Sequence, residues 1–248
     1  MATCLGSGGA FGVAFIMGVL DAFADRGLDV AEGPLLGSSA GAWAAAARVS
    51  GVGFEEIMHT WEAHQWNRPV RVIDITRPLF GQRRDARVTG MALRMPLMRR
   101  VPVSGASHPL ADLVAASSSP PRMAKPHRIG IHRYVDSVAR FTSADRSPAA
   151  RLHVVVTPLG GTVLGRLGGF AERTTRYEMA RWRARHGGTQ LFVRPTRAIA
   201  GLVNDTEALF RIGTARETYP VAYQLGEQCL DRFRLRHPDL AKELLTDD

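Results

Sequence analysis

The first 66 residues alternate between short apolar runs and stretches with helical periodicity. Ile16, Val19, Leu20 and Phe23 recur at the i, i+3, i+4, i+7 spacing of an amphipathic helix, whereas a short run without that spacing is typical of a buried strand. The pattern predicts a strand, a helix, a strand and two further helices, at residues 2–6, 13–26, 34–36, 40–49 and 54–66. This order favours an α/β fold with parallel strands.

The stretch from residue 67 to residue 109 has no clean periodicity. The segment RVIDITRPLF at 71–80 indicates a strand. Residues 88–103 mix methionine, arginine and proline, and we interpret them as a surface loop with short helices. A mobile cover over a site is the alternative for the same residues.

The second half of the chain has clearer elements. RLHVVVTPL at 151–159 is a continuous β-branched run, as expected for a fully buried strand. The other predictions are a helix, a hairpin, a helix, a strand and one or two helices, at 109–117, 128–136, 168–186, 189–195 and 206–234, before a helical end after Pro238. No internal repeat or linker divides the chain, so we predict a single domain over residues 1–248.

Composition narrows the class of protein. The chain has 45% hydrophobic and 22% charged residues, which fits a globular protein with a proper core. No apolar run reaches the roughly 18 residues that span a bilayer, and the first residues lack the pattern of a signal peptide. We therefore expect a cytoplasmic protein. Cys4 and Cys229 form no disulfide framework, and the eight histidines have no metal-binding spacing, so we expect neither metal nor cofactor.

The net charge of +9 comes almost entirely from arginine. Such a charge suits an anionic partner, such as phospholipid headgroups, nucleic acid or an acidic substrate, although arginine content also follows genome base composition. Five arginines fall on the predicted helix over 168–186, where they form either a solvated face or a face that meets anionic lipid: Arg173, Arg176, Arg181, Arg183 and Arg185. No nucleic-acid motif accompanies them, so we expect no nucleic-acid partner.

The sequence GSSAG at 37–41 fits the pattern G-x-S-x-G with Ser39 at its centre. In a sharp strand-to-helix turn, the central serine has a strained backbone and an exposed hydroxyl, and Gly37 and Gly41 must be small because the chain passes close to itself there. The amides at the helix start favour developing negative charge. The alternative is a close helix–strand crossing in which Ser39 only caps the helix.

A second glycine-rich turn, GSGGAFG at 6–12, also joins a strand to a helix. Its backbone amides could bind an oxyanion or a phosphate. A dinucleotide site is disfavoured, because Phe11 occupies the third glycine position and the next strand ends in Gly37-Ser38-Ser39 instead of an acidic residue. A third feature is Asp136 at the end of a predicted strand, which either accepts a proton from a nucleophile or begins a turn.

Taken in order, three segments of the chain resemble the patatin-like phospholipases: LGSGGAFGVAFIMGVLDAF, LLGSSAGAWAAAA and AASSSPPRMAKPHRIGIHRYVDS. That family pairs a glycine-rich loop with G-x-S-x-G and a later D-G-[GA], and its serine works with an aspartate and without histidine. The resemblance runs through most of the chain and includes the buried strand after the aspartate. It implies a three-layer α/β/α fold with a mainly parallel central sheet.

The resemblance also implies roles for individual residues. Ser39 would be the nucleophile and Asp136 its general base, while the amides of Gly8 and Gly9, with Ala10 as a third donor, would form the oxyanion hole. The implied activity is that of a lipid acyl hydrolase of the phospholipase A, lysophospholipase or esterase type. Its substrate would be a phospholipid or another acyl ester, with peripheral contact to an anionic membrane.

Some positions depart from the family pattern. Ser7 replaces the first glycine of the loop, and Phe11 stands where the family has a cation. Ser137 and Val138 replace the glycines after the aspartate, and we find no strand with a T-G turn before the alanine–serine segment. These departures motivate an alternative, namely a catalytically weak member that binds acyl lipid or membrane.

A Ser-His-Asp hydrolase is a third hypothesis. Three histidines follow Asp136 in the chain: His153, His186 and His237. We expect His153 to be structural, because it begins a buried strand, and none of the three has a convincing motif.

Overall fold

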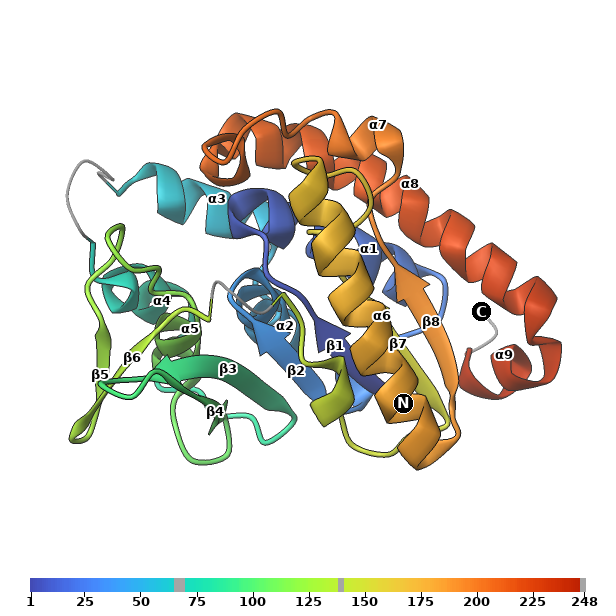
Figure 1. Ribbon diagram of the computed structural model, residues 1–248, viewed down its shortest axis with the longest axis horizontal. Coiled ribbons are helices and arrows are strands. Elements are labelled where there is room, and N and C mark those ends of the chain that lie inside the picture. Colours follow the sequence, from blue (N-terminus) through green and yellow to red (C-terminus); the bar gives the residue numbers. More distant parts are fainter. Residues whose placement is uncertain (65–69, 138–140, 246–248) are drawn as a thin grey trace.

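A computed structural model describes residues 1–64, 70–137 and 141–245. Its centre is an eight-stranded sheet in which β4 pairs with β3 beside the path β5-β6-β3-β2-β1-β7-β8 (Figure 1). The strands are β1 (Ala2–Leu5), β2 (Leu35–Ser38), β3 (Val88–Arg94), β4 (Arg99–Ser104), β5 (His127–Ile129), β6 (His132–Val135), β7 (Leu152–Val156) and β8 (Thr189–Val193).

The helices lie on both faces of this sheet, an arrangement compatible with three α/β/α layers. In Figure 1, α6 crosses in front of the sheet, whereas α1, α2 and α5 lie behind it. The helices in the described residues are α1 (Gly9–Asp25), α2 (Ala40–Ser50), α3 (Phe54–Glu62), α4 (Val72–Phe80), α5 (Leu110–Ser117), α6 (Arg166–His186), α7 (Arg197–Ala200), α8 (Ile212–Arg236) and α9 (Pro238–Leu244). Three short 3-10 turns complete the order: η1 (Val30–Glu32), η2 (Ala144–Arg146) and η3 (Ala208–Phe210).

Strand pairing divides the sheet into two parts. β3, β2, β1, β7 and β8 pair in parallel, while β4 and β6 pair antiparallel with β3, and β5 pairs antiparallel with β6. The sheet is therefore mixed, and the prediction of a mainly parallel sheet is wrong. Short connections join β3 to β4 and β5 to β6, and a tight hairpin can join only antiparallel strands.

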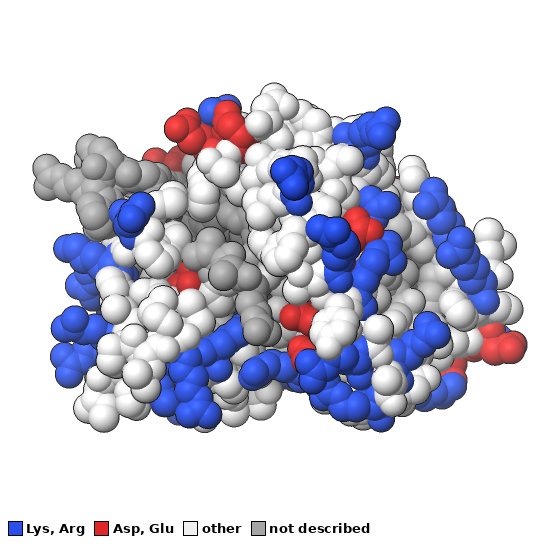
Figure 2. All heavy atoms as spheres, in the orientation of Figure 1, with Lys and Arg blue, Asp and Glu red and all other residues white. Residues whose placement is uncertain are grey.

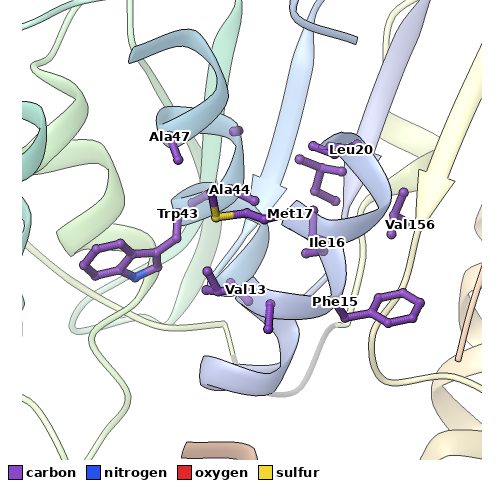
Figure 3. Packing of buried hydrophobic residues seen from close by; sticks show 14 of the residues in the cluster. Val13, Phe15, Ile16, Met17, Leu20, Trp43, Ala44, Ala47 and Val156 are labelled. Carbon is purple, nitrogen blue, oxygen red and sulfur yellow. The ribbon is translucent and has the colours of Figure 1, made fainter. Parts of the chain in front are cut away.

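The core is densest where α1 passes between the sheet, α2 and α8. Figure 3 shows Val13, Ile16 and Met17 of α1 close to the alanine-rich side of α2, on which Ala44 and Ala47 are buried. Small side chains let these helix backbones approach closely, and every buried methylene contributes about 0.8 kcal/mol of hydrophobic stabilisation. This packing fixes the starts of α1 and α2 relative to each other, and the candidate site lies at these two helix starts.

Two predictions from the middle of the chain are wrong. Residues 71–80 form α4 instead of a strand, because burial of Val72, Ile73 and Phe80 on one side of a helix outweighs the β propensity of the isoleucines and valine. Residues 88–103 form the β3–β4 hairpin instead of a loop with short helices. β3 is also a strand before the alanine–serine segment, where the sequence had indicated none.

The other predicted elements agree with the structure within a few residues. The start of α1 shifts from residue 13 to Gly9, and in the region predicted as 206–234 the long helix α8 begins only at Ile212, after η3. The predicted helix over 54–66 ends at Glu62, and its last two residues lie outside the described part of the chain. Among the described residues, no helix is long and apolar enough to cross a membrane.

Candidate active site

Ser39 occupies a sharp turn between β2 and α2. It has φ 51° and ψ −113°, an unusual backbone conformation for a residue with a side chain. Both flanking glycines are required by space: a Cβ on Gly37 would clash with the backbone of Gly41, and a Cβ on Gly41 would clash with the carbonyl of Leu5 in β1. The geometry is that of a strained strand-to-helix turn with a serine at its apex.

Asp136 directly follows β6, and it lies near Ser39 because β2 and β6 both pair with β3. β4 occupies one edge of β3, so β2 and β6 must share the other edge. Along that shared edge, β2 runs up to Ser38 opposite Met91, and the antiparallel β6 runs down to Val135 opposite Leu93. The two strands therefore run towards each other, and only Ala92 of β3 lies between the levels at which they end. Ser39 and Asp136 are the residues that follow these two strand ends.

The carboxyl group of Asp136 is buried, with 5% of the residue exposed. Burial raises the pKa of Asp136 to about 7, although a hydrogen bond with the Ser39 side chain and the charge of Arg100 oppose the shift. Its Oδ1 atom has no hydrogen-bond partner within the described residues. A carboxyl group with a pKa near neutrality can take up and release a proton at physiological pH.

Three consecutive serines at the end of α5 and directly after it, Ser117, Ser118 and Ser119, hold the two site residues. The amide of Ser39 donates to Ser117 Oγ at 3.0 Å, and Ser117 Oγ donates to the carbonyl of Met91 at 2.7 Å. The hydroxyl of Ser118 donates to the carbonyl of Ser39 at 3.3 Å, and the amide of Asp136 donates to the carbonyl of Ser119 at 2.9 Å. Sequence reasoning gave these serines no role, although SSSPP directly after a helix is itself a signal of side chains free to bond a neighbouring backbone.

Arg100 of β4 is a second contributor that sequence reasoning missed. Its guanidinium donates to the carbonyl of Thr142 at 2.7 Å and makes a longer bond of 3.4 Å to Ser38 Oγ. Because its charge favours the ionised form of Asp136, Arg100 partly offsets the effect of burial on that carboxyl group. The position lies in a segment where no strand was predicted, so no sequence pattern pointed to it.

The glycine-rich loop faces the same place. α1 begins at Gly9, and the first amides of a helix have no acceptor within the helix. Gly8 and Gly9 line the cavity beside Ser39, whereas Ala10 is wholly buried and is not part of its lining. A Cβ on Gly8 would lie 2.7 Å from the Cα of Gly12 and 2.8 Å from the Cβ of Pro158, so only glycine fits there.

Ser39 and Asp136 both line a cavity of about 440 Å³. Its walls are mostly apolar and come from α2, α3, α4, the segment after α5, the segment after β7 and η3 with the start of α8. The apolar lining residues are Trp43, Trp61, Val72, Pro120, Met123, Leu159, Leu209, Phe210 and Ile212. A cavity of this size with few polar groups suits a chain-like apolar ligand with one polar reacting centre.

The residues that depart from the pattern of the resembled family differ in whether they line the cavity. Phe11 is wholly buried and stacks with Phe15, so it does not stand in the cavity. Ser7 lines the cavity, and its Oγ has no hydrogen-bond partner in the part of the chain that the structure describes. Ser137 is buried beside Asp136, and Val138 lies outside the described residues.

None of the three candidate histidines lines the cavity. The ring of His153 is buried in β7 against Trp182, with 4.2 Å between ring centroids, which agrees with the expected structural role. His186 ends α6 and also contacts Trp182, and His237 precedes α9. Among the described residues, no group of three or more His, Cys, Asp or Glu side chains is arranged to hold a metal ion.

We compared the chain with known protein families and with curated proteins. No model of a known protein family matches the chain, and no curated protein matches it by sequence.

Proposed function

We propose that this protein is a serine hydrolase of acyl esters, with Ser39 as nucleophile and Asp136 as general base. The observation that carries the proposal is the meeting of β2 and β6 on one edge of β3, which sets a strained serine against a buried carboxyl group. The sequence resemblance to patatin-like phospholipases supports the same pair of residues.

Each step of the proposed reaction has a group to perform it. Ser39 Oγ attacks the ester carbonyl carbon while Asp136 takes the hydroxyl proton, and the amides of Gly8 and Gly9 stabilise the oxyanion. The C–O bond then breaks, and Asp136 returns the proton to the departing alcohol. Water, activated by Asp136, releases the carboxylic acid and restores Ser39.

The apolar cavity favours lipid acyl esters over short polar esters as substrates. Burying an apolar chain against Trp43, Leu159 and Leu209 contributes about 0.8 kcal/mol per methylene. A lipid acyl hydrolase of the phospholipase or lysophospholipase type is therefore the substrate class that we propose.

A binding protein with little turnover is the second candidate. Ser137, buried where the resembled family has glycine, favours it, because a side chain there constrains the loop that presents Asp136. Turnover of a chromogenic acyl ester distinguishes the two: hydrolysis that Asp136→Asn abolishes supports the enzyme, and ligand binding without hydrolysis supports the binding protein.

Labelling by a fluorophosphonate probe tests the nucleophile directly. We expect Ser39→Ala to abolish the label and Ser38→Ala, which alters the neighbouring serine of the same turn, to keep it. A folded protein that takes up no probe, or a label that persists in Ser39→Ala, would contradict the proposal.

A further inference from the structure

The tips of the two antiparallel hairpins lie side by side at one end of the sheet. β3 pairs with β6 through Leu93 opposite Val135 and Arg94 opposite Tyr134, and the amide of Met95 donates to the carbonyl of Arg133 at 2.8 Å. Both chains turn back directly beyond these contacts, at residues 95–98 and 130–131, so the two hairpin turns lie at the same end of the sheet. We call residues 94–99 together with residues 128–133 the hairpin end.

The hairpin end carries three exposed aliphatic side chains. Leu97 is 86% exposed, Ile131 is 85% exposed and Met98 is 46% exposed. Single exposed apolar residues are normal on any protein, but several gathered on neighbouring tips indicate an interaction surface. Leu97 lies in the turn of the β3–β4 hairpin, and Ile131 lies in the turn of the β5–β6 hairpin.

The hairpins that carry these side chains are rich in arginine. The two hairpins, residues 88–104 and 127–135, contain five arginines and no aspartate or glutamate. Figure 2 shows lysine and arginine side chains gathered on the end of the molecule that the hairpins form.

Four of these arginines face each other in pairs. Arg94 lies opposite Arg99 across β3–β4, and Arg128 lies opposite Arg133 across β5–β6. Like charges directly opposite each other destabilise a sheet, each pair by a few tenths of a kcal/mol to about 1 kcal/mol. An anionic surface against the hairpins would relieve this repulsion, so the arrangement points to an anionic partner.

The arginine-rich helix α6 differs in this respect. Arg176 pairs with Glu172 at 2.7 Å, and both Arg181 and Arg185 lie within 4 Å of Asp145. Much of its positive charge is therefore neutralised within the protein, and the exposed aromatic Tyr177 lies under Arg181. Three large apolar side chains of α6 are also exposed, namely Leu167, Phe170 and Tyr177, but Leu97 and Ile131 at the hairpin end are more exposed than any of them. Within the described residues, Arg94, Arg99, Arg128 and Arg133 have no ion pair with an acidic side chain.

We propose that the hairpin end docks onto the surface of an anionic phospholipid bilayer. Leu97, Met98 and Ile131 enter the boundary between headgroups and acyl chains, while the arginines contact lipid phosphates. The docking surface lies on the catalytic side of the sheet, because β3 runs parallel to β2 and continues three residues, about 10 Å, past the level of Ser38. If the proposed function holds, the bilayer is also the source of the substrate. The docking itself does not depend on catalysis, although the inference rests on the proposed function for this role.

Vesicle co-sedimentation of the full chain tests this docking. The background is Ser39→Ala, so that hydrolysis cannot alter the vesicles, and the vesicles contain phosphatidylcholine with or without phosphatidylglycerol. We expect binding that requires phosphatidylglycerol and weakens with salt. The double substitution Leu97→Ser with Ile131→Ser should lower the partition coefficient at least about tenfold, because it removes the two most exposed apolar side chains of the hairpin end.

A matched control is Leu235→Ser, at a residue that is 84% exposed near the end of α8. It should bind vesicles as the background protein does. A second arm, Arg99→Gln with Arg133→Gln, should weaken binding and reduce its dependence on salt.

Three results would overturn the docking proposal. These are no binding to either vesicle, unchanged binding of the Leu97/Ile131 variant, or loss of binding in Tyr177→Ser on α6 instead. In the protein that retains Ser39, the hairpin substitutions should leave turnover of a soluble chromogenic ester unaffected. A failed docking proposal would leave that turnover intact, whereas a failed hydrolase proposal would leave vesicle binding intact.

Discussion

Ser39 and Asp136 follow two strands that run towards each other along the same edge of β3. Ninety-seven positions separate them in the chain (136 − 39 = 97), yet one position of β3 lies between the levels at which β2 and β6 end. Their approach is thus set by backbone hydrogen bonds of the sheet. Two residues held by backbone pairing in this way are positioned before a substrate binds, as the proposed reaction requires.

The first prediction concerns Ser117, which accepts from the amide of Ser39 and donates to the carbonyl of Met91. Ser117→Ala leaves a buried donor and a buried acceptor unpaired, which should lower the free energy of unfolding by about 1–3 kcal/mol. Urea unfolding measures this, and fluorophosphonate labelling of Ser39 should slow in parallel. Ser107→Ala, at an exposed turn, is the control and should change neither quantity.

The second prediction concerns the glycine that follows the turn. Gly41→Ala would press a methyl group against the carbonyl of Leu5, a backbone atom that cannot move without disturbing β1. We expect a loss of about 3 kcal/mol or failure to fold, seen in thermal and urea unfolding. Gly169→Ala in α6, where a Cβ meets nothing within 4 Å, should instead stabilise the protein by about 1 kcal/mol. Equal behaviour of the two variants would contradict this account of the turn.

The third prediction is a pH dependence governed by Asp136. Burial raises its pKa to about 7, and only the ionised form can accept the Ser39 proton, so the labelling rate should rise with pH with a midpoint near that value. Arg100→Gln removes a charge that lowers this pKa, and it should move the midpoint to higher pH. Arg99→Gln, its exposed neighbour, should leave the midpoint in place. A midpoint that does not move in Arg100→Gln would remove the electrostatic role of that arginine.

The same carboxyl group affects stability. Its folded pKa lies above the unfolded value of 3.8, so the folded state binds the proton more tightly. The resulting stabilisation is fully present below about pH 4 and is lost as the pH rises through about 7. Asp136→Asn should flatten this part of the curve of unfolding free energy against pH, as measured by urea unfolding.

The fourth prediction separates His153 from catalysis. Burial lowers the pKa of His153 to about 4, so between about pH 6.5 and about pH 4 the unfolded chain takes up a proton that the folded protein does not. Stability should therefore fall as the pH drops through this range, and His153→Leu should reduce the fall while leaving Ser39 labelling unchanged. The exposed His59→Leu is the control and should leave the acid dependence as it is. Loss of labelling in His153→Leu, in a protein that is still folded, would revive a histidine-assisted mechanism.

The sequence by itself determined the elements with strong local signals. The spacing of Ile16, Val19 and Phe23 located α1, and the β-branched run at 152–156 located β7. The two glycines around Ser39 also predicted a sharp strand-to-helix turn, although the same pattern allowed a close helix–strand crossing with Ser39 as a helix cap. Such signals depend on residues a few positions apart, and a sequence displays them directly.

Only the tertiary structure decided how these parts meet. Residues 72–80 became a helix and residues 88–104 a hairpin because burial against distant elements outweighed their local preferences. The pairing of β6 beyond the end of β2, the three serines that hold the turn, and the charge of Arg100 near Asp136 all join residues far apart in the chain. Hydrogen bonds and burial between distant segments leave no periodic trace in a sequence, so the serines that hold the turn and the charge of Arg100 emerged only from the tertiary structure.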